Sequence, residues 1–337
     1  MSKILFISPN PVWGGAATAS IAVAKMLRDN GHIIVYNDEY LNNEEYDSIP
    51  IDHTKIHQNR FSDRKFMQKL IKDNHINCII WSPLVAIYFY HEIKQLKKQG
   101  IKQIAIIHSL SLNRNIKGRI MDYLVSLTLT NMSAIVYVSQ YTKNIWNSFR
   151  TLRRSKIKKI VIHNFVDIKG GCHTLDIERP RIGFVGRLSE EKQPQIFCNL
   201  SVHKQYDFIV YGDGPLLSDL KSKYKEIKFK GHCSNLKQIY SDIDILVMTS
   251  KFENCPMVIL EAQAFAIPCI APKVGGISEL IENGVNGILY DNYDTGNIIN
   301  AIREILSNYS RFSTNSLQCS KRHTSLSAIN LWNDILK

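Results

Sequence analysis

The first 37 residues contain the stretch that decides the fold: "KILFISP" (3–9), "WGGAATASIAVAKMLRDNG" (13–31) and "HIIVYN" (32–37). The first apolar run predicts a buried strand, the glycine pair predicts a turn that opens a helix, and Gly31 predicts the end of that helix. The second apolar run predicts another strand. Strand, helix and strand in this order indicate a βαβ unit on a parallel sheet.

The same alternation continues in two series along the 337 residues. The first series predicts further strands at residues 76–83, 103–109, 133–139 and 159–164. The second series predicts strands at residues 181–188, 207–215, 227–232, 244–250 and 268–272. Between the two series the rhythm breaks in a turn-rich stretch. We therefore expect an α/β protein with two doubly wound Rossmann-like domains that face each other across a cleft.

These breaks predict the domain boundaries. We expect an N-terminal domain at residues 1–165, a linker at 166–180 and a C-terminal domain at 181–318. The tail, residues 319–337, has a helical pattern, and we expect this helix to return to the N-terminal domain.

The composition is that of a globular protein, with 45% hydrophobic and 21% charged residues. No apolar run reaches the roughly 18 residues that a membrane-spanning helix requires. The apolar run at the start is too short for a signal peptide, so we expect a cytoplasmic protein. The seven cysteines show neither a CxxC nor a metal-finger spacing, which favours reduced thiols.

The net charge of +12 is concentrated in one segment. Residues 55–160 contain 20 Lys and Arg against four Asp and Glu, whereas residues 171–337 contain 18 of each. Such an asymmetry indicates an anionic partner: a nucleic acid, a membrane surface or a phosphorylated ligand.

Polar residues and glycines recur where the predicted strands end. In doubly wound sheets, ligands bind outside the carboxyl ends of the strands. The residues at these ends are Gly14, Gly15, His108, Ser139, Asn164, Gly186, Arg187, Gly212, Asp213, Gly214 and Glu253. His108 is open to two interpretations, a structural histidine or one that faces the cleft.

Two basic residues follow the first strand of the second series, in "GFVGRLSEEKQP". Arg187 can bind a phosphate with two parallel hydrogen bonds, and Lys192 adds a mobile charge, so together they could neutralise a diphosphate. The alternative is a pair of solvated charges. In "VYGDGPLLSDL", a turn with Pro215 at the first helical position explains the residues equally well.

Two aspartates, Asp242 and Asp244, form the DxD pattern that can hold a divalent metal. They lie at the amino end of a predicted strand, however, which is the wrong end of a parallel sheet for an active site. We therefore predict no metal site.

The stretch "SKFENCPMVILEAQAFAIP" (250–268) carries two acids. A loop holds Glu253, Pro256 opens a helix that runs to about Phe265, and Glu261 lies inside that helix. About one and a half turns separate Glu261 from Pro256, so the two acids would contact different parts of an elongated ligand. They could equally be a loop acid and a partly exposed helix acid. The following "APKVGGISEL" predicts a glycine turn with free N–H groups and then a helix.

In this order, the glycine pair, "GRLxxxK", "GDGP", Glu-x7-Glu and "GGxxE" resemble the retaining glycosyltransferases of family 4, which have the GT-B fold. The segment "HNFVD" (163–167) resembles their Asn-x-x-Asp segment. The resemblance spans roughly residues 3–310 and is most specific over 181–290. One departure is Ala266 at a packing position where the family usually has Gly.

The resemblance implies a role for each matching residue. Arg187 and Lys192 would bind the diphosphate of a nucleotide sugar, Glu261 the ribose hydroxyls and Glu253 the sugar hydroxyls, while His108 would orient the sugar. Glu253, His108, Arg187 and Lys192 are thus the implied catalytic residues. The implied donor-binding set is Gly15, Gly186, Arg187, Lys192, Gly212, His232, Cys233, Glu253, Asn254, Cys255, Pro256, Met257, Val258 and Glu261.

The resemblance also implies a reaction: transfer of a sugar, with retention, from a nucleotide-diphosphate sugar to a hydroxyl of a glycan or lipid-linked acceptor. A UDP-sugar is favoured over a GDP-sugar, and no further cofactor or metal is expected. The implied setting is bacterial surface polysaccharide synthesis, of O-antigen, capsule or lipopolysaccharide. A sugar-nucleotide epimerase or a phosphorylase with the same fold is the alternative reaction.

The basic segment suggests where such an enzyme would work. The stretches 59–72 and 114–129 mix basic residues with apolar ones at near-helical spacing, and "RTLRRSKIKK" (150–159) is densely cationic. Basic amphipathic helices favour anionic lipid surfaces, so we predict a peripheral protein on the cytoplasmic face of a membrane. Solvated helix faces are the alternative. A nucleic-acid-binding protein would explain the charge but not the balanced C-terminal half, and no aromatic-basic RNA-binding motif is present.

Overall fold

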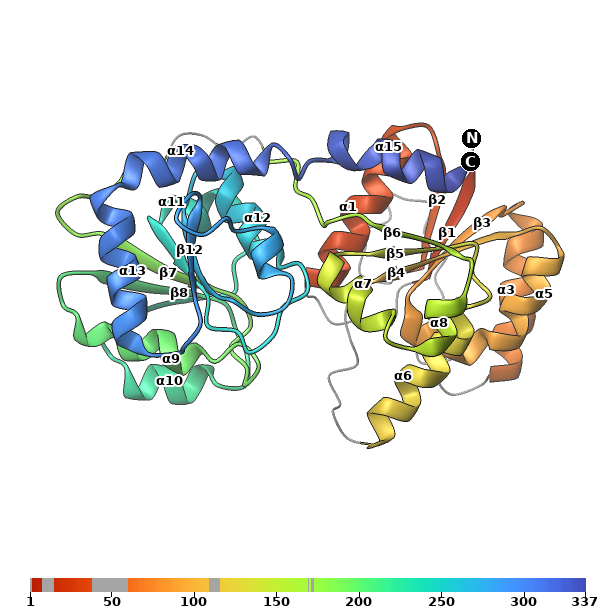
Figure 1. Cartoon of the computed structure of the whole chain (residues 1–337), viewed down its shortest axis with the longest axis horizontal. Coiled ribbons are helices and arrows are strands. Elements are labelled where there is room, and N and C mark those ends of the chain that lie inside the picture. Colours follow the sequence, from red (N-terminus) through yellow and green to blue (C-terminus); the bar gives the residue numbers. More distant parts are fainter. Residues whose placement is uncertain (1, 8–14, 38–59, 109–115, 169, 171–172) are drawn as a thin grey trace. The chain divides into compact units, whose positions relative to one another are not determined.

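The computed structural model describes residues 2–7, 15–37, 60–108, 116–168, 170 and 173–337. Gly14 and Arg114 therefore lie outside the described residues. The chain divides into two compact units. Unit 1 comprises Met1–His163 with Ser325–Lys337, and unit 2 comprises Asn164–Thr324. Each unit contains one six-stranded sheet (Figure 1).

The sheet of unit 1 is parallel throughout, in the order β2-β1-β3-β4-β5-β6. Its strands are β1 Lys3–Ile7, β2 Ile33–Asn37, β3 Cys78–Trp81, β4 Lys102–Ile107, β5 Ala134–Tyr137 and β6 Lys158–Val161. Its helices are α1 Gly15–Asp29, α3 Arg60–Asp73, α4 Pro83–Ala86, α5 Tyr90–Lys98, α6 Ile116–Leu129, α7 Gln140–Trp146, α8 Arg150–Arg154 and α15 Ser325–Leu336, with the 3-10 turn η1 Ile87–Phe89.

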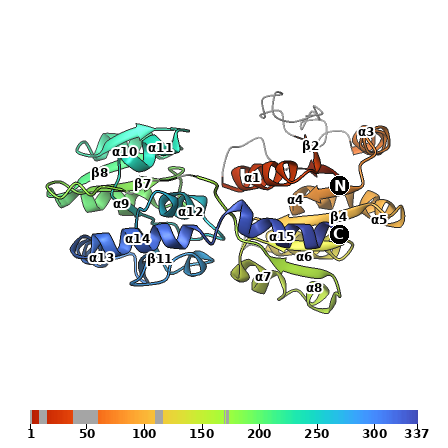
Figure 2. The same cartoon turned by 90° about the horizontal axis from the view of Figure 1, so that it is seen from above.

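Helices cover both faces of this sheet. The helices α1 and α15 contact each other and lie side by side on one face (Figures 1 and 2). On the other face, apolar residues of α3, α5 and α6 pack with those of the strands into one buried cluster. Lys102 of β4 and Lys158 of β6 donate hydrogen bonds to carbonyl oxygens at the end of α15. A positively charged lysine at a helix C-terminus stabilises the helix, because it interacts favourably with the negative end of the helix dipole.

The sheet of unit 2 is also parallel, in the order β12-β11-β10-β7-β8-β9. Its strands are β7 Arg181–Val185, β8 Asp207–Tyr211, β9 Lys228–Gly231, β10 Ile245–Val247, β11 Cys269–Pro272 and β12 Gly287–Tyr290. Its helices are α9 Pro194–Asn199, α10 Leu217–Lys223, α11 Leu236–Ser241, α12 Met257–Ala264, α13 Thr295–Ser307 and α14 Tyr309–Ser320, with the 3-10 turns η2 Leu200–Val202 and η3 Ile277–Glu279.

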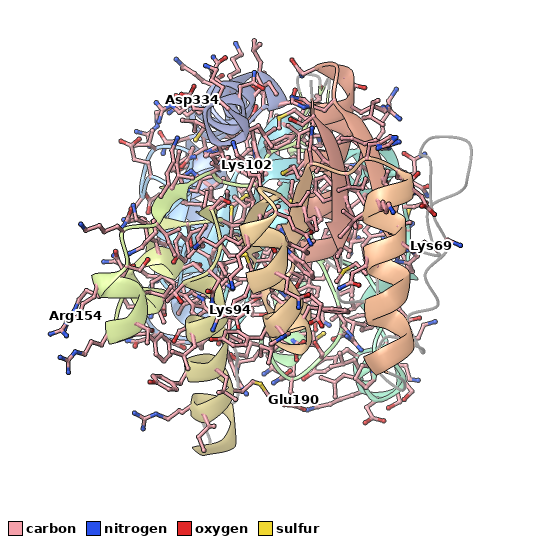
Figure 3. The ribbon with its side chains drawn as sticks, turned by 90° about the vertical axis from the view of Figure 1, so that its right-hand side faces the viewer. Lys69, Lys94, Lys102, Arg154, Glu190 and Asp334 are labelled. Carbon is pink, nitrogen blue, oxygen red and sulfur yellow. The ribbon has the colours of Figure 1, made fainter. Side chains whose placement is uncertain are left out.

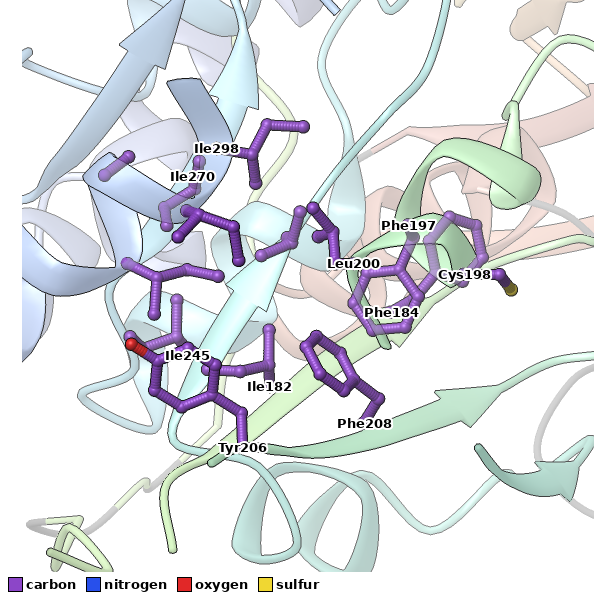
Figure 4. Close-up of a cluster of buried hydrophobic side chains, with 14 of the residues drawn as sticks. Ile182, Phe184, Phe197, Cys198, Leu200, Tyr206, Phe208, Ile245, Ile270 and Ile298 are labelled. Carbon is purple, nitrogen blue, oxygen red and sulfur yellow. The ribbon is translucent and has the colours of Figure 1, made fainter. Parts of the chain in front are cut away.

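The core of unit 2 lies between its strands and helices such as α9 and α13. Phe184 of β7, Phe197 of α9 and Phe208 of β8 pack in sequence, one pair tilted and one edge to face, with ring centroids 5.7 and 5.8 Å apart (Figure 4). Ile298 of α13 completes the same cluster with Ile245 and Ile270. This packing fixes the strands of unit 2 relative to one another, and with them the loops that carry the predicted site residues.

The predicted α/β class with two parallel sheets is confirmed. The sequence pattern missed β12, a four-residue strand whose two central residues are only half-buried. The predicted tail helix is observed as α15, which begins at Ser325. Pro215 does not open a helix, because α10 begins two residues later at Leu217. No described helix is long and apolar enough to cross a membrane.

Candidate functional site

The loops after β7 and β8 touch through their backbones. Gly212 has φ +140°, and a Cβ at this position would lie 1.9 Å from the carbonyl oxygen of Gly186. Any side chain here would force the two loops apart. The contact continues where the N–H of Leu188 donates to the carbonyl of Asp213 at 2.9 Å. Arg187 is exposed and lies on the loop after β7, which the loop after β8 supports through these backbone contacts.

The loop after β10 supports the same segment further along. The hydroxyl of Thr249 donates to the carbonyls of Lys192 and Gln193 at 2.8 and 2.9 Å. The N–H of Lys251 donates to the carbonyl of Glu191 at 2.8 Å. The loops after β7 and β10 are thus joined by the shared Thr249 proton and by the Lys251 N–H, and this connection places Lys192 next to the loop that carries Glu253.

Lys192 and Glu253 form an ion pair. The Lys192 ammonium and the Ser250 hydroxyl both donate to Oε1 of Glu253, the hydroxyl from 2.9 Å. The side chain of Glu253 is 11% exposed. A carboxylate that is this buried requires hydrogen-bond donors, because an unpaired buried charge is costly. The structure therefore joins one of the two predicted diphosphate cations to the acid predicted to hold the sugar.

The glycine pair after β11 fixes the backbone of Glu253. The N–H of Gly276 donates to the carbonyl of Glu253 at 2.9 Å, and a Cβ on Gly275 would lie 1.7 Å from the same oxygen. The predicted turn with free N–H groups is therefore wrong for Gly276, whose N–H is used within the protein. The helix predicted after it is only the short 3-10 turn η3.

The two residues after Glu253 are buried. The carbonyl of Cys255 accepts a hydrogen bond of 2.8 Å from the side chain of Asn164. Burial raises the pKa of the Cys255 thiol to about 12, so this thiol is not a nucleophile at neutral pH. The helix α12 then begins at Met257 with Pro256 as its N-cap, which confirms the predicted start of the helix. The first N–H groups of such a helix have no partner within the helix itself.

Glu261 lies in α12, as predicted, but it is buried rather than partly exposed. Only 7% of the residue is accessible, and burial raises the pKa of its carboxyl group. Oε2 accepts a hydrogen bond of 2.8 Å from the hydroxyl of Tyr240 in α11. At the end of β9, His232 is exposed and the half-buried Cys233 contacts the side chain of Gln238 at 3.6 Å.

The remaining predicted residues, Gly15 and His108, belong to unit 1. Gly15 is the first residue of α1, and His108 directly follows β4. Nε2 of His108 lies 3.0 Å from the hydroxyl of Ser20 in α1. Burial lowers the pKa of His108 to about 4, so its imidazole is neutral at physiological pH and is suited to hydrogen bonding rather than to donating charge.

The aspartates of the DxD pattern have structural partners. Asp244 is fully buried and pairs with Arg181 and His173, each at 2.7 Å. Asp242 accepts a hydrogen bond of 2.5 Å from the hydroxyl of Tyr211. No group of three or more potential metal ligands occurs among the residues that the structure describes.

Sequence reasoning did not single out Ser250, Tyr240 or Thr249. Tyr240 and Thr249 contact predicted site residues that are distant in sequence, and Ser250 contacts Glu253 within its own loop. No signal in the chain itself marks such partners. The one sequence signal that could have identified Ser250 is its position as the last residue of the predicted strand 244–250.

Relatives match both halves of the chain. Residues 13–169 match the family described as Glycosyltransferase Family 4, and residues 179–308 match Glycosyl transferases group 1. The O-antigen biosynthesis glycosyltransferase WbnH of Escherichia coli is 30% identical over 259 residues, which cover 72% of this chain and 72% of WbnH.

Two further relatives match a shorter stretch. A GDP-mannose-dependent alpha-mannosyltransferase of Corynebacterium glutamicum is 35% identical over 134 residues, 39% of this chain and 32% of that protein. A UDP-Gal:alpha-D-GlcNAc-diphosphoundecaprenol alpha-1,3-galactosyltransferase of Escherichia coli is 31% identical over 132 residues, 35% of this chain and 34% of that protein. Each match therefore spans about one third of the relative's length.

Among solved structures, Anabaena HepE in complex with UDP and glucose superposes with a TM-score of 0.76 at 18% identity and covers 100% of this chain and 99% of that one. This similarity shows the fold. With both halves of the chain matched and WbnH aligned over most of its length, the chain belongs to glycosyltransferase family 4 and is a glycosyltransferase of the GT-B type.

Proposed function

We propose that this glycosyltransferase moves a sugar, with retention of configuration, from a nucleotide-diphosphate sugar to a hydroxyl of a glycan or lipid-linked acceptor. The observation that carries the proposal is the Lys192–Glu253–Ser250 arrangement at the ends of β7 and β10. It sets a cation for a leaving phosphate beside an acceptor for sugar hydroxyls. Relatives whose names include O-antigen biosynthesis support a role in bacterial surface polysaccharide synthesis.

In this proposal, negative charge develops on the diphosphate as the anomeric bond breaks. Arg187 and Lys192 would stabilise that charge, and the backbone of their loop is already braced by Thr249 and Asp213, so that backbone needs little reorganisation. Lys192 would shift from Glu253 to the phosphate when the donor binds, which leaves Ser250 to hold Glu253. We infer front-face attack, with the leaving phosphate as the base for the acceptor hydroxyl. No step requires a metal.

A UDP-sugar is the donor that we favour. The solved HepE complex contains UDP, and one relative is named for UDP-Gal. The relative named for GDP-mannose makes a GDP-sugar the second candidate. In the proposal, Gly186, Gly212, His232 and Cys233 lie along the nucleotide, and Asn254, Cys255, Pro256, Met257 and Val258 lie along the diphosphate and sugar. Gly15 and His108 would contribute from unit 1.

Thermal unfolding with a panel of nucleotides tests the donor. UDP, GDP and ADP are compared at one common concentration, and a nucleotide present at about 100 times its Kd would add about 2.7 kcal/mol to the free energy of unfolding. We expect one nucleotide, UDP, to raise the unfolding midpoint by several degrees and the others to have little effect. Turnover of UDP-sugars with and without acceptors then separates a transferase from an epimerase or a phosphorylase. The absence of any shift with all three nucleotides would contradict the proposed donor class.

We also propose that unit 1 docks on an anionic membrane. Four large apolar side chains are exposed within five residues of α6: Ile120 (55%), Met121 (40%), Tyr123 (50%) and Leu124 (42%). The neighbouring α8 carries the exposed Arg150, Arg153 and Arg154 and is joined to α6 by a 2.7 Å contact between hydroxyls of Ser126 and Thr151. Figure 3 shows the Arg154 side chain directed away from the body of the unit. Apolar groups next to arginines match the chemistry of an anionic bilayer surface.

The structure changes which helices can form the predicted membrane-binding surface, because the apolar residues of α3 do not lie on it. Leu70 and Ile71 of α3, which the sequence pattern assigned to an amphipathic surface, are buried in the core of unit 1. The side chains of Phe61 and Phe66 lie outside the described part of the chain. The membrane proposal therefore rests on α6 and α8.

Flotation with vesicles of phosphatidylcholine and phosphatidylglycerol at physiological salt tests this surface. We expect the wild type to float with mixed vesicles and not with pure phosphatidylcholine. Changing Arg150, Arg153 and Arg154 to Gln should lower the bound fraction by roughly tenfold or more, at about 1 kcal/mol per charge. Changing the exposed Lys94, Lys97 and Lys98 of α5 to Gln removes the same charge elsewhere and serves as the control (Figure 3 labels Lys94). Equal loss in both variants, or self-association through α6 without lipid, would contradict membrane docking.

A further inference from the structure

The buried carboxylate of Glu261 has an unusual environment for an acid that is to bind a ligand. It lies in α12, only 7% exposed, and burial raises its pKa. Burial without a donor would keep the group protonated at a higher pH and would weaken it as a hydrogen-bond acceptor. Some feature of the fold must therefore favour its charged form.

Tyr240 provides that feature. Its hydroxyl lies 2.8 Å from Oε2 of Glu261 and 3.2 Å from the carbonyl of Val258. The hydroxyl has one proton, and a bond to a carboxylate is the stronger of the two. The hydrogen bond lowers the pKa of Glu261 and partly offsets the effect of burial.

The ring of Tyr240 is held as firmly as its hydroxyl. Tyr240 is fully buried, and its ring stacks on Phe265 with centroids 5.3 Å apart and an interplanar angle of 19°. Cys269 of β11 is another titratable group near this hydroxyl, and burial raises the pKa of that thiol, so it remains neutral. Tyr240 thus reaches Glu261 from a fixed position and without competition from a second charge at Cys269.

We propose that Tyr240 is the positioning residue for nucleotide binding: it fixes Oε2 of Glu261, so that the other carboxylate oxygen is oriented and charged to accept hydrogen bonds from the ribose hydroxyls. This proposal rests on the proposed function of the site. It adds to that function a buried side chain that does not touch the ligand and yet sets the affinity and the pH dependence of nucleotide binding.

The test is the Kd of UDP and of GDP for the wild type and for Tyr240→Phe, measured by titration calorimetry from about pH 5 to about pH 9. In the wild type, binding should weaken as the pH falls through the raised pKa of Glu261. In Tyr240→Phe the donor to the charged form is lost, so the pKa rises further and the weakening begins at a higher pH. Near neutral pH we expect the Kd of Tyr240→Phe to be roughly tenfold higher than that of the wild type. This difference in Kd should become smaller towards high pH.

A chemical control isolates the ribose. With 2′-deoxy-UDP or 2′-deoxy-GDP, a hydroxyl that Glu261 would bind is absent, so Tyr240→Phe and the wild type should differ much less. Tyr309→Phe removes another buried hydroxyl, one that donates to the carbonyl of Asp244 at 2.8 Å, and should leave the Kd unchanged. Glu261→Gln should bind weakly at every pH. Because Phe keeps the stack on Phe265, circular dichroism should show a folded variant.

Three outcomes would overturn the inference. One is a Tyr240→Phe variant with the wild-type Kd and pH midpoint. The second is an equal loss for the normal and the 2′-deoxy nucleotides, which would indicate a general packing defect. The third is a wild type that binds neither UDP nor GDP at any pH, which contradicts the proposed function and the inference together. In the first two outcomes the wild type still binds a nucleotide, so the inference fails while the proposed function stands.

Discussion

Glu253→Gln is expected to lower kcat/KM by roughly 100-fold or more, since the loss of a charged hydrogen-bond acceptor at a reacting sugar costs about 3 kcal/mol. At the same time, the affinity for free UDP should stay the same or become tighter. In the ligand-free site, the Lys192 ammonium is paired with Oε1 of Glu253. Without the negative charge of Glu253, that ammonium is more available to a phosphate, and UDP lacks the transferred sugar whose hydroxyls the carboxylate would hold.

A fall in turnover without a fall in UDP affinity distinguishes this role from simple damage to the site. A disordered loop would lower both. Steady-state kinetics with a UDP-sugar and calorimetry with UDP measure the two quantities on the same preparation. Glu190→Gln is the matched control, because Glu190 is an exposed acid two residues from Lys192, and its loss removes the same charge without touching the pair. Wild-type turnover in Glu253→Gln, or a similar fall in Glu190→Gln, would refute the assignment.

Periodicity and apolar runs predicted the βα alternation because buried parallel strands are almost wholly apolar, as "KILFI" and "CIIW" are here. The strand β12 was missed for the converse reason. It lies at the edge of its sheet, and its central Ile288 and Leu289 are only half-buried, so its pattern is short and follows a glycine turn. Edge strands make fewer contacts and leave a weaker trace in the sequence.

The candidate site could be predicted only as a set of chemical groups at strand ends. The pairing of Lys192 with Glu253, the hydroxyl of Tyr240 on Glu261 and the use of the Gly276 N–H all depend on tertiary contacts between residues 21 to 61 positions apart. An amphipathic pattern also cannot predict which of the two basic helices, α3 or α6, packs its apolar side against the core. Packing buries Leu70 of α3 and leaves Ile120 of α6 exposed.

Gly275→Ala is expected to lower the free energy of unfolding by about 3 kcal/mol and to reduce turnover strongly. The added methyl group would lie 1.7 Å from the carbonyl oxygen of Glu253, well inside contact distance. The backbone must therefore move, and the 2.9 Å hydrogen bond from the Gly276 N–H to the same oxygen would be strained or lost. Because Glu253 is then displaced, both stability and catalysis should suffer.

Gly284→Ala separates crowding from backbone strain. Gly284 has φ +76° and Gly275 has φ +60°, so both occupy the left-handed region, but a Cβ at Gly284 would have no heavy atom within 4 Å. This control should cost only the strain of a left-handed alanine, about 1 kcal/mol, and should keep wild-type turnover. Urea unfolding and steady-state kinetics of both variants make the comparison. Equal losses at the two positions would mean that backbone conformation, rather than contact with Glu253, explains the glycine at 275.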